Sequence, residues 1–506
     1  MSPLGLKPKS TEGEKTPVRS HSHQVDDVML NETRRWRFAI ILWISASLLV
    51  HIQIPILGQE TPPIVPVSQD TLPSYSEAVE AHLGYVTDYS LDEYGSKKTS
   101  VWLGQIDIRT SQLPSEQDNA TAWPISNLYL DQPTMVAAIE MGRITGCKCY
   151  QESITRYLKE HLDSLHSITS NPLLFCLTKD YDVRTDLFST QKSPHSFTSY
   201  TPAWEILARE SPNLVRLSIK SLITECLKPN EQRSNPTLLH DTSPLSFDAL
   251  IMARSMAISS LAWYSAQNPT DARPLARYAT ELTKLSTEEY LQLSSLSPSI
   301  QARWATALID WSKVNQSLEM DASINFLLQP GQPVSLEPPR SSDNVTSDHK
   351  KQTLQGFSQP ESEVGKKGRN TINTWLEHHV ALGQASLRAW QQTNNPEFLL
   401  KAKKHGGVVA SYLRKNPLSN ANTETFARLI YFFDRLGDST ENGEHSRLAV
   451  QLADVAMQTF YEPRLGMFRS NQGADLCDAR NGPGFLLIAL LVLDGNDPTR
   501  LSSLSF

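Results

Sequence analysis

Cysteine is scarce in this sequence, with five residues in a chain of 506. Disulfide-dependent secreted domains carry cysteine at much higher density, so no disulfide framework is expected, although the number allows one long-range bridge. Cys147 and Cys149 lack the second pair of ligands that a zinc site needs. We therefore expect neither a metal nor another cofactor. The five cysteines are Cys147, Cys149, Cys176, Cys226 and Cys477.

The chain also lacks an excess of positive charge. Lys and Arg number 47 against 54 Asp and Glu, which gives a net charge of −7. Binding of nucleic acid depends on a basic surface, so we expect no nucleic-acid partner. Hydrophobic residues make up 39% of the chain and charged residues 20%. This composition is that of a globular protein with a large core.

One apolar run near the start of the chain suggests a targeting segment. Arg34, Arg35 and Arg37 precede the run, which extends from Phe38 to Val50 and is followed by a polar, Pro-containing stretch up to Gly58. This order is typical of an export signal that is cleaved after Gly58. Residues 38–57 are alternatively long enough to be an uncleaved membrane anchor. In either case we expect an exported protein, periplasmic or extracellular.

Changes in composition divide the chain into seven segments. Polar stretches rich in Pro, Ser and Lys are expected to be disordered or to act as linkers. The segments are a disordered leader (1–37), a signal peptide or anchor (38–58), a Pro-rich linker (59–75), a loop-rich lead-in (76–130), a first helical part (131–328), a disordered polar insertion (329–370) and a second helical part (371–506).

The helical parts are built from pairs of helices. In Val380 to Leu413, apolar residues recur at helical spacing on both sides of the break Asn394-Asn395-Pro396. One such hairpin cannot bury both of its apolar stripes, so several must pack together. Their irregular spacing argues against a solenoid of 34-residue repeats and favours a closed ring of helical hairpins, an all-α fold. The other hairpins span 135–162 with a break at 145–146, 203–226 with a break at 211–213, 248–284 with a break at 267–269, and 424–460 with a break around 437–438, followed by a single helix at 485–493.

Several blocks of sequence carry a family resemblance. They are Tyr89 to Asp107 (YSLDEYGSKKTSVWLGQID) with Asn127 to Asp131 (NLYLD), Tyr181 to Asp186 (YDVRTD), His195 to Ile206 (HSFTSYTPAWEI), and Glu462 to Arg469 (EPRLGMFR). From about Tyr89 to Leu493 the chain resembles bacterial exported proteins of the six-hairpin, (α/α)6-toroid type, often labelled pectate-lyase-like. The resemblance implies a toroid and a carbohydrate context.

Two departures from this pattern indicate a weakened or re-purposed site. Cys176 to Thr178 stands where the family has a Gly-Gly-His turn, so an imidazole is missing there. After Cys226, in place of an Asn-Arg-His element, the chain reads LKPNEQRSNPTLLHD, in which only His240 could substitute. The resemblance therefore leaves two functions open, a carbohydrate-active enzyme and a degenerate toroid that binds glycans or serves the cell envelope.

The candidate catalytic residues fit two reactions. For a polysaccharide lyase, His195 and Tyr200 would act as base and acid while Arg184 neutralises a uronate carboxylate. A glycoside hydrolase needs two carboxylates about 5 to 10 Å apart, for which the candidates are Asp182, Asp186 and Glu205. Simpler roles remain open, since Glu205 lies in a first helical turn, the aspartates suit turns, and His195 suits a helix cap.

Further residues are candidates for substrate binding. Trp204 could stack on a sugar or belong to the core, where its helical spacing also places it. Glu377, His378 and His379 adjoin one another on a helix and cannot chelate a metal on one face, so Glu377 or His379 facing the ring cavity is the functional alternative. The net negative charge suits an acidic glycan only if arginines, Arg428 among them, gather in the cleft. The full substrate-binding set is Tyr181, Arg184, Asp186, Trp204, His379, Arg469, Asp478 and Arg480.

Overall fold

The computed structural model describes residues 72–504, except for 115–124, 164, 166–168, 170, 190–198, 228–245, 316–323, 325–366, 417 and 419–420. By its contacts the chain divides into two units, Met1–Pro63 and Ile64–Phe506, and all described residues lie in the second. The expected leader, the targeting segment and most of the linker and of the polar insertion lie outside the described residues.

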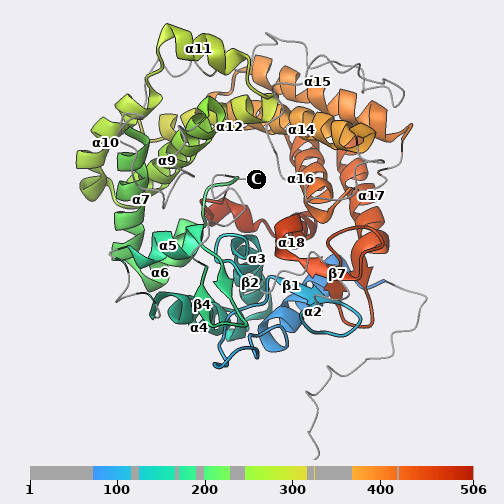
Figure 1. The fold of residues 1–506 in the computed structure, drawn as a ribbon. Coiled ribbons are helices and arrows are strands. Elements are labelled where there is room, and N and C mark those ends of the chain that lie inside the picture. Colours follow the sequence, from blue (N-terminus) through green and yellow to red (C-terminus); the bar gives the residue numbers. More distant parts are fainter. Residues whose placement is uncertain are drawn as a thin grey trace, which may run out of the picture. The chain divides into compact units, whose positions relative to one another are not determined.

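The second unit is a ring of helices, which confirms the expected all-α, toroid-like class (Figure 1). The described helices are α2 (Tyr75–Asp88), α3 (Gln132–Thr145), α4 (Cys149–Asp163), α5 (Pro172–Thr178), α6 (Trp204–Glu210), α7 (Pro212–Leu227), α9 (Phe247–Gln267), α10 (Pro269–Thr283), α11 (Thr287–Ser294), α12 (Pro298–Ser312), α14 (Lys367–Thr393), α15 (Pro396–Leu413), α16 (Thr423–Thr440), α17 (Gly443–Phe460) and α18 (Pro483–Leu493).

Contacts between helices run around the whole ring. They pass from α3 to α4, and from α4 through α5 and, in parallel, through α6 to α7. From α7 they continue through α9, α12, α14 and α16 to α18, which packs against α3 again. Helices α10, α15, α17 and α2 lie outside this circuit (Figure 1). Helix α18 is apolar on every side, and each of its residues from Pro483 to Val492 is buried. A short helix of this kind must be covered all round, and α2, α3 and α16 pack against it.

Short antiparallel strands support the loops between helices. They are β1 (Gln105–Asp107), paired with β7 (Leu476–Asp478); β2 (Ile125–Ser126), β3 (Tyr181–Asp182) and β4 (Leu187–Phe188), in one sheet; and β5 (Tyr461–Glu462), paired with β6 (Met467–Phe468). Two short 3-10 helices, η2 (Ala479–Asn481) and η3 (Pro498–Leu501), flank α18. The pairing of β1 with β7 joins the first and last parts of the unit.

The helical hairpins expected from periodicity are present, and one break is corrected. Helix α16 continues past Gly437 to Thr440, so the break expected around 437–438 was wrong. A Cβ on Gly437 would lie 2.2 Å from the Ser446 hydroxyl on α17. The glycine therefore permits close packing of the two helices, and the turn follows at Glu441, whose φ is +50°.

Helix α2 lies in a stretch that the sequence suggested to be loop-rich. Ser74 accepts a hydrogen bond from the N–H of Glu77, and the Glu77 carboxylate accepts one from the N–H of Ser74. This reciprocal cap starts the helix. Val79, Leu83 and Val86 then bury one face against the ring. Helix α14 likewise begins at Lys367, inside the segment 329–370.

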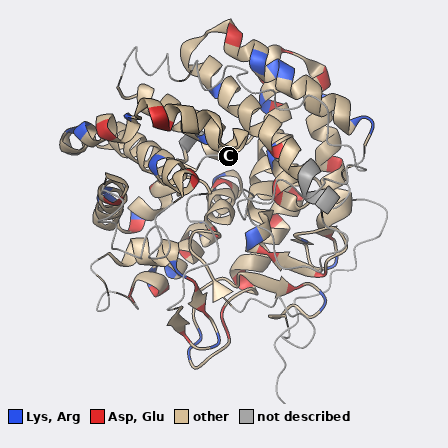
Figure 2. Cartoon of the chain, turned by 45° about the horizontal axis from the view of Figure 1, so that its top comes forward, with Lys and Arg blue, Asp and Glu red and all other residues tan. Residues whose placement is uncertain are grey.

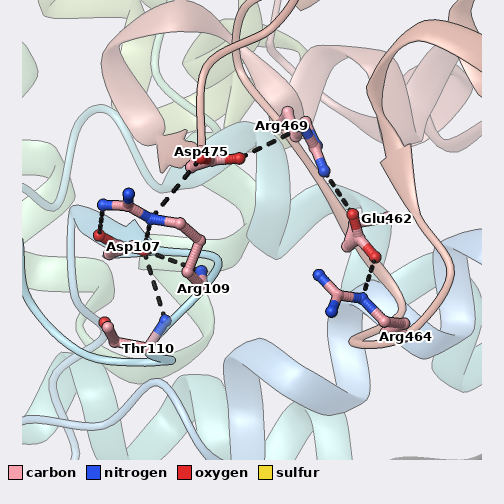
Figure 3. Close-up of polar contacts among 7 residues, drawn as sticks. All are labelled: Asp107, Arg109, Thr110, Glu462, Arg464, Arg469 and Asp475. Atoms are coloured by element: carbon pink, nitrogen blue, oxygen red, sulfur yellow. Dashed lines mark hydrogen bonds and ion pairs between the residues drawn. The ribbon is translucent and has the colours of Figure 1, made fainter.

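A chain of ion pairs ties the two ends of the unit together (Figure 3). Arg109, just after β1, contacts both Asp107 and Asp475. Arg469, just after β6, contacts Asp475 and Glu462 in turn. Two segments far apart in sequence are thus joined by charge as well as by the β1–β7 ladder.

Two arginines that share Glu462 provide a matched test of this chain of ion pairs. The Arg469 side chain is 24% exposed and that of Arg464 is 68% exposed. Solvent screens exposed pairs, so we expect Arg469→Gln to lower the free energy of unfolding by about 1 kcal/mol and Arg464→Gln by less. Denaturant titration of both variants measures the difference, and equal losses would show that the chain of ion pairs does not support the ring.

The disulfide in the structure is local. It joins Cys147 and Cys149, so the long-range bridge that the sequence allowed is not formed among the described cysteines. Within the described ranges, no helix is long and apolar enough to cross a membrane. The apolar run 38–50 lies outside these ranges.

Candidate functional site

Four inner elements of the ring contribute a group of charged side chains and one tyrosine. Arg303 comes from α12, Glu377 from α14, Glu424 and Arg428 from α16, and Tyr129 from the turn before α3. Each interacts electrostatically with at least one other member of the group. We call these five residues the interior cluster.

The centre of the cluster is an ion pair on α16. Arg428 donates through Nε and Nη2 to Oε1 of Glu424, at 3.0 and 2.7 Å. The spacing of four residues places both side chains on one face of the helix. The Arg428 guanidinium also lies 5.6 Å from the centre of the Phe485 ring, within range of a cation–π interaction. Arg428 is thereby held in one place by a carboxylate and an aromatic ring.

The N-terminus of α16 is fixed by the loop that precedes α18. Asn422 caps the helix by accepting from the N–H of Thr425, and the Thr423 hydroxyl donates to the Asn481 carbonyl at 2.6 Å. Gly482 adopts a φ of +75°, and a Cβ there would lie 2.6 Å from Cβ of Glu424. The absence of a side chain at Gly482 therefore lets this loop lie against Glu424.

Glu377 has an environment different from that of Glu424. Solvent reaches its side chain, yet protein atoms surround it closely enough that burial raises the pKa to about 7. The negative charge of Glu424 adds to this increase, and the positive charge of Arg428 opposes it. Glu377 is therefore partly protonated at neutral pH, whereas Glu424 is held in an ion pair.

Tyr129 and Arg303 complete the cluster. The ring of Tyr129 stacks on that of Tyr200, with centres 4.1 Å apart. The Tyr129 hydroxyl accepts from the N–H of Tyr200 at 2.6 Å and donates to its carbonyl at 2.7 Å. Burial lowers the pKa of Arg303 to about 10, so this side chain is still a cation at neutral pH. The cluster thus holds two guanidinium groups and two carboxyl groups.

The turn that presents Tyr129 is itself held by buried polar groups. Asn127 Oδ1 accepts from the N–H groups of Tyr129 and Leu130, at 3.0 and 3.1 Å. Asp131, 4% exposed, accepts from the hydroxyl of Tyr157 at 2.7 Å. Burial raises the pKa of Asp131 to about 7, although its hydrogen bonds with the Tyr157 and Ser126 hydroxyls oppose the shift.

The raised pKa of Asp131 predicts a dependence of stability on pH. The folded protein retains a proton on this carboxyl up to about pH 7, whereas the unfolded chain loses it near the ordinary value of 3.8. The free energy of unfolding should therefore fall as pH rises from about 4 to 7. Asp131→Asn should reduce this fall. Thermal unfolding of both proteins across this range tests the expectation, and identical slopes would contradict it.

Among the residues proposed from sequence as catalytic, those described contact other parts of the protein. The Tyr200 hydroxyl donates to the Tyr129 carbonyl, and burial raises its pKa well above the ordinary value. Glu205, in the first turn of α6, accepts from Ser502 and Ser503 near the end of the chain. Asp182 Oδ1 accepts from the N–H of Arg184 at 2.9 Å, as in a turn. His195 lies outside the described residues.

The proposed binding residues near β3 stabilise a hairpin. The Tyr181 ring is buried edge-on against Phe188, and Arg184 follows on the turn. Asp186 accepts from the hydroxyl and the N–H of Ser96, at 2.7 and 2.6 Å, which lowers its pKa. A Cβ on Gly95, whose φ is +66°, would collide with the Asp186 carboxylate.

The other proposed binding residues are distributed around the ring. Trp204 is fully buried, and its Nε1 donates to the Ser260 hydroxyl on α9 at 2.9 Å, which gives it a core position. His379 is also fully buried, with Nδ1 2.9 Å from Nδ1 of His405. Arg469 belongs to the chain of ion pairs shown in Figure 3. Asp478 and Arg480 form a bidentate pair, and Gln105 Nε2 also donates to Asp478 at 2.9 Å.

The structure therefore brings together only part of the proposed site. Tyr200 stacks on a member of the interior cluster, while Glu205, Arg184 and Asp478 have separate partners. Sequence reasoning named Glu377 and Arg428 as possibilities, and it missed Tyr129, Arg303 and Glu424. The spacing of Glu424 and Arg428 was visible in the sequence, but the same spacing occurs in ordinary solvated pairs.

The cluster is suited to acid–base chemistry and to anion binding. A protonated carboxyl beside an ionised one can supply an acid and a base, and guanidinium groups bind carboxylates. Lys and Arg are interspersed with Asp and Glu around the ring, and no large surface of one sign is visible in this view (Figure 2). No group of three or more His, Cys, Asp or Glu side chains that could hold a metal ion occurs in the described part of the chain.

Comparisons with known proteins add little to this site. No family model matches the sequence, and no curated protein matches it. Among solved structures, the ring resembles the crystal structure of an unsaturated glucuronyl hydrolase specific for heparin, with 10% sequence identity and a TM-score of 0.41. The match covers 83% of this chain and 97% of that enzyme. A likeness this remote does not bear on the reaction.

Proposed function

We propose that the protein hydrolyses glycosidic bonds in an acidic polysaccharide, and that the interior cluster is its active site. Glu377 is the general acid that protonates the leaving oxygen. Glu424 is the ionised carboxylate that activates water or attacks the sugar. Arg303 and Arg428 hold carboxylate groups of the substrate.

The observation that carries this proposal is the contrast between the two carboxyl groups. Burial raises the pKa of Glu377 to about 7, whereas Glu424 accepts two hydrogen bonds from Arg428. Glycoside hydrolysis needs one carboxyl group protonated and a second ionised at the same pH. Their mutual electrostatic interaction places them in one neighbourhood of the ring.

The two arginines support an acidic substrate. A guanidinium group matches a carboxylate with two parallel hydrogen bonds, and it stays charged at any physiological pH. Arg428 has five N–H donors, of which two point at Glu424.

The geometry favours hydrolysis over β-elimination. Elimination with Tyr200 as the acid would need its phenol beside the leaving oxygen, but that hydroxyl donates to the Tyr129 carbonyl in a buried position. The hydrolytic pair needs no such rearrangement. We further propose that the reaction takes place outside the cytoplasm, because a basic stretch and an apolar run precede the ring in the sequence.

The full chain can be tested on a panel of acidic and neutral polysaccharides. New reducing ends without new ultraviolet absorbance indicate hydrolysis, whereas absorbance from an unsaturated product indicates elimination. We expect reducing ends from an acidic polymer and a rate that falls as pH rises through about 7, when Glu377 loses its proton. An unsaturated product would overturn the hydrolytic mechanism.

A glycan-binding protein without activity is the second candidate. The contacts that occupy Glu205, Asp182 and Tyr200 favour it, because none of these groups points freely at a substrate. Calorimetry with the same panel separates the two candidates. Binding of an acidic polymer without any cleavage would support the binding function and contradict the enzymatic one.

A further inference from the structure

The last described residues of the chain return to the ring and contact Glu205. Ser502 Oγ donates to Oε1 of Glu205 at 2.5 Å, and the N–H of Ser503 donates to Oε2 at 2.9 Å. The Leu504 side chain is 3% exposed. We call residues Ser502 to Leu504 the tail.

The Ser503 hydroxyl also contacts Glu205, together with backbone groups of Pro202 and Trp204. Its oxygen accepts from the N–H of Trp204 at 2.7 Å and lies 2.6 Å from the Pro202 carbonyl and 2.8 Å from Glu205 Oε2. A hydroxyl has one proton, so it donates to one of these two acceptors at a time. Two adjacent hydroxyls therefore meet one carboxylate, one backbone carbonyl and one backbone N–H.

This is the arrangement with which a protein holds neighbouring hydroxyl groups of a sugar. The carboxylate accepts from two hydroxyls, while a backbone N–H and a carbonyl fix the orientation of one of them. The place adjoins the interior cluster, because Tyr200, two residues before Pro202, stacks on Tyr129 and packs edge-on against Phe485. A glycan held by the cluster would pass close to it.

The tail can leave without unfolding the ring. The segment before it has anchors of its own, since Asp497 pairs with Arg435 and the Thr499 hydroxyl lies 3.1 Å from that of Tyr431. Ser502 and Ser503 are only partly buried, and Leu504 contributes the single buried side chain of the tail. Release of three residues would cost a few hydrogen bonds that water and a ligand can replace.

We propose that Glu205, Trp204 N–H and Pro202 carbonyl form a hydroxyl-binding subsite for the glycan, and that the tail occupies it as an internal competitor. The proposal rests on the proposed function for the class of ligand. A ligand that needs the subsite must displace the tail, so the apparent affinity is reduced by the fraction of molecules in which the tail is bound.

The double variant Ser502→Ala/Ser503→Ala tests this competition. It removes both hydroxyls and keeps Glu205 intact. Calorimetry with a hyaluronan tetrasaccharide as probe should show binding about 5- to 10-fold tighter than that of the full-length wild-type chain. Ser294→Ala/Ser295→Ala is the matched control, because these adjacent serines bond to carbonyls of their own helical turn. The control should bind like the wild type.

Hydrogen exchange supplies a second readout on the wild-type protein. The amide of Ser503 should be protected without the probe and should lose protection when the tetrasaccharide binds. Equal affinity of the double variant and the wild type, or a Ser503 amide that stays protected in the complex, would overturn the tail proposal and leave cleavage by Glu377 and Glu424 standing. The tail proposal would also be overturned if the double variant failed to bind the tetrasaccharide at millimolar concentration. The proposed function is decided separately, by the cleavage assays on the polysaccharide panel.

Discussion

Replacing Glu377 with glutamine is expected to lower kcat by about 10²- to 10⁴-fold on the acidic polysaccharide that the panel identifies. Glutamine keeps the size of the side chain and removes the proton that the leaving oxygen needs. Because burial raises the pKa of Glu377 to about 7, the wild-type rate should fall as pH rises through that value. The residual activity of the variant should lose this fall. Reducing-end assays across the pH range measure both effects.

Glu397→Gln is the matched control for this experiment. Glu397 is an exposed carboxylate in the first turn of the outer helix α15, and the change makes the same replacement of a carboxyl group by an amide. It should leave kcat unchanged. Thermal unfolding of both variants separates a lost acid from a damaged fold. A folded Glu377→Gln variant with wild-type kcat would show that another group donates the proton.

Replacing Gly482 with alanine is expected to lower the free energy of unfolding by about 2 to 4 kcal/mol. Two physical effects add at this position. The φ of +75° strains any residue with a side chain, and the new Cβ would lie 2.6 Å from Cβ and 3.1 Å from Cα of Glu424. Neither atom can move without displacing α16. The variant should therefore also lose activity, because Glu424 belongs to the interior cluster.

Gly473→Ala isolates the first of these effects. Gly473 has a φ of +71°, and nothing lies within 4 Å of a Cβ built there. The change should cost about 1 kcal/mol through backbone strain alone and should leave kcat intact. Denaturant titration of the two variants gives the difference that is due to contact with Glu424. Equal losses would mean that the loop before α18 moves away at no cost.

The helices could be predicted from the sequence because their signals are local. Apolar residues at helical spacing marked both members of the Val380 to Leu413 hairpin, and Asn395-Pro396 marked the turn between them. The break misplaced at Gly437 shows the limit of such signals. A glycine inside a helix can serve a turn or a close helix contact, and only the position of Ser446 on α17 decides which.

The candidate site was predicted only in part, because its members come from distant elements. Glu377 and Arg428 were named as possibilities, but neither their neighbours nor their environment could be read from adjacent residues. For Trp204 the sequence left two roles open, sugar stacking and the core. The structure gives it a core position, because it is fully buried and its indole N–H donates to the Ser260 hydroxyl on α9.

The sequence by itself determined the all-α class and the breaks of most hairpins, because periodicity and turn residues act over a few positions. The closed ring was an expectation, and the contact between α18 and α3 decides it. Tertiary structure alone decided which charged residues meet inside the ring. Glu424 and Arg428 would pair weakly on a solvated helix as well. They lie beside Glu377 only because α14 packs against α16. Burial and proximity across the ring set the protonation of these groups, and both depend on contacts between residues far apart in the chain.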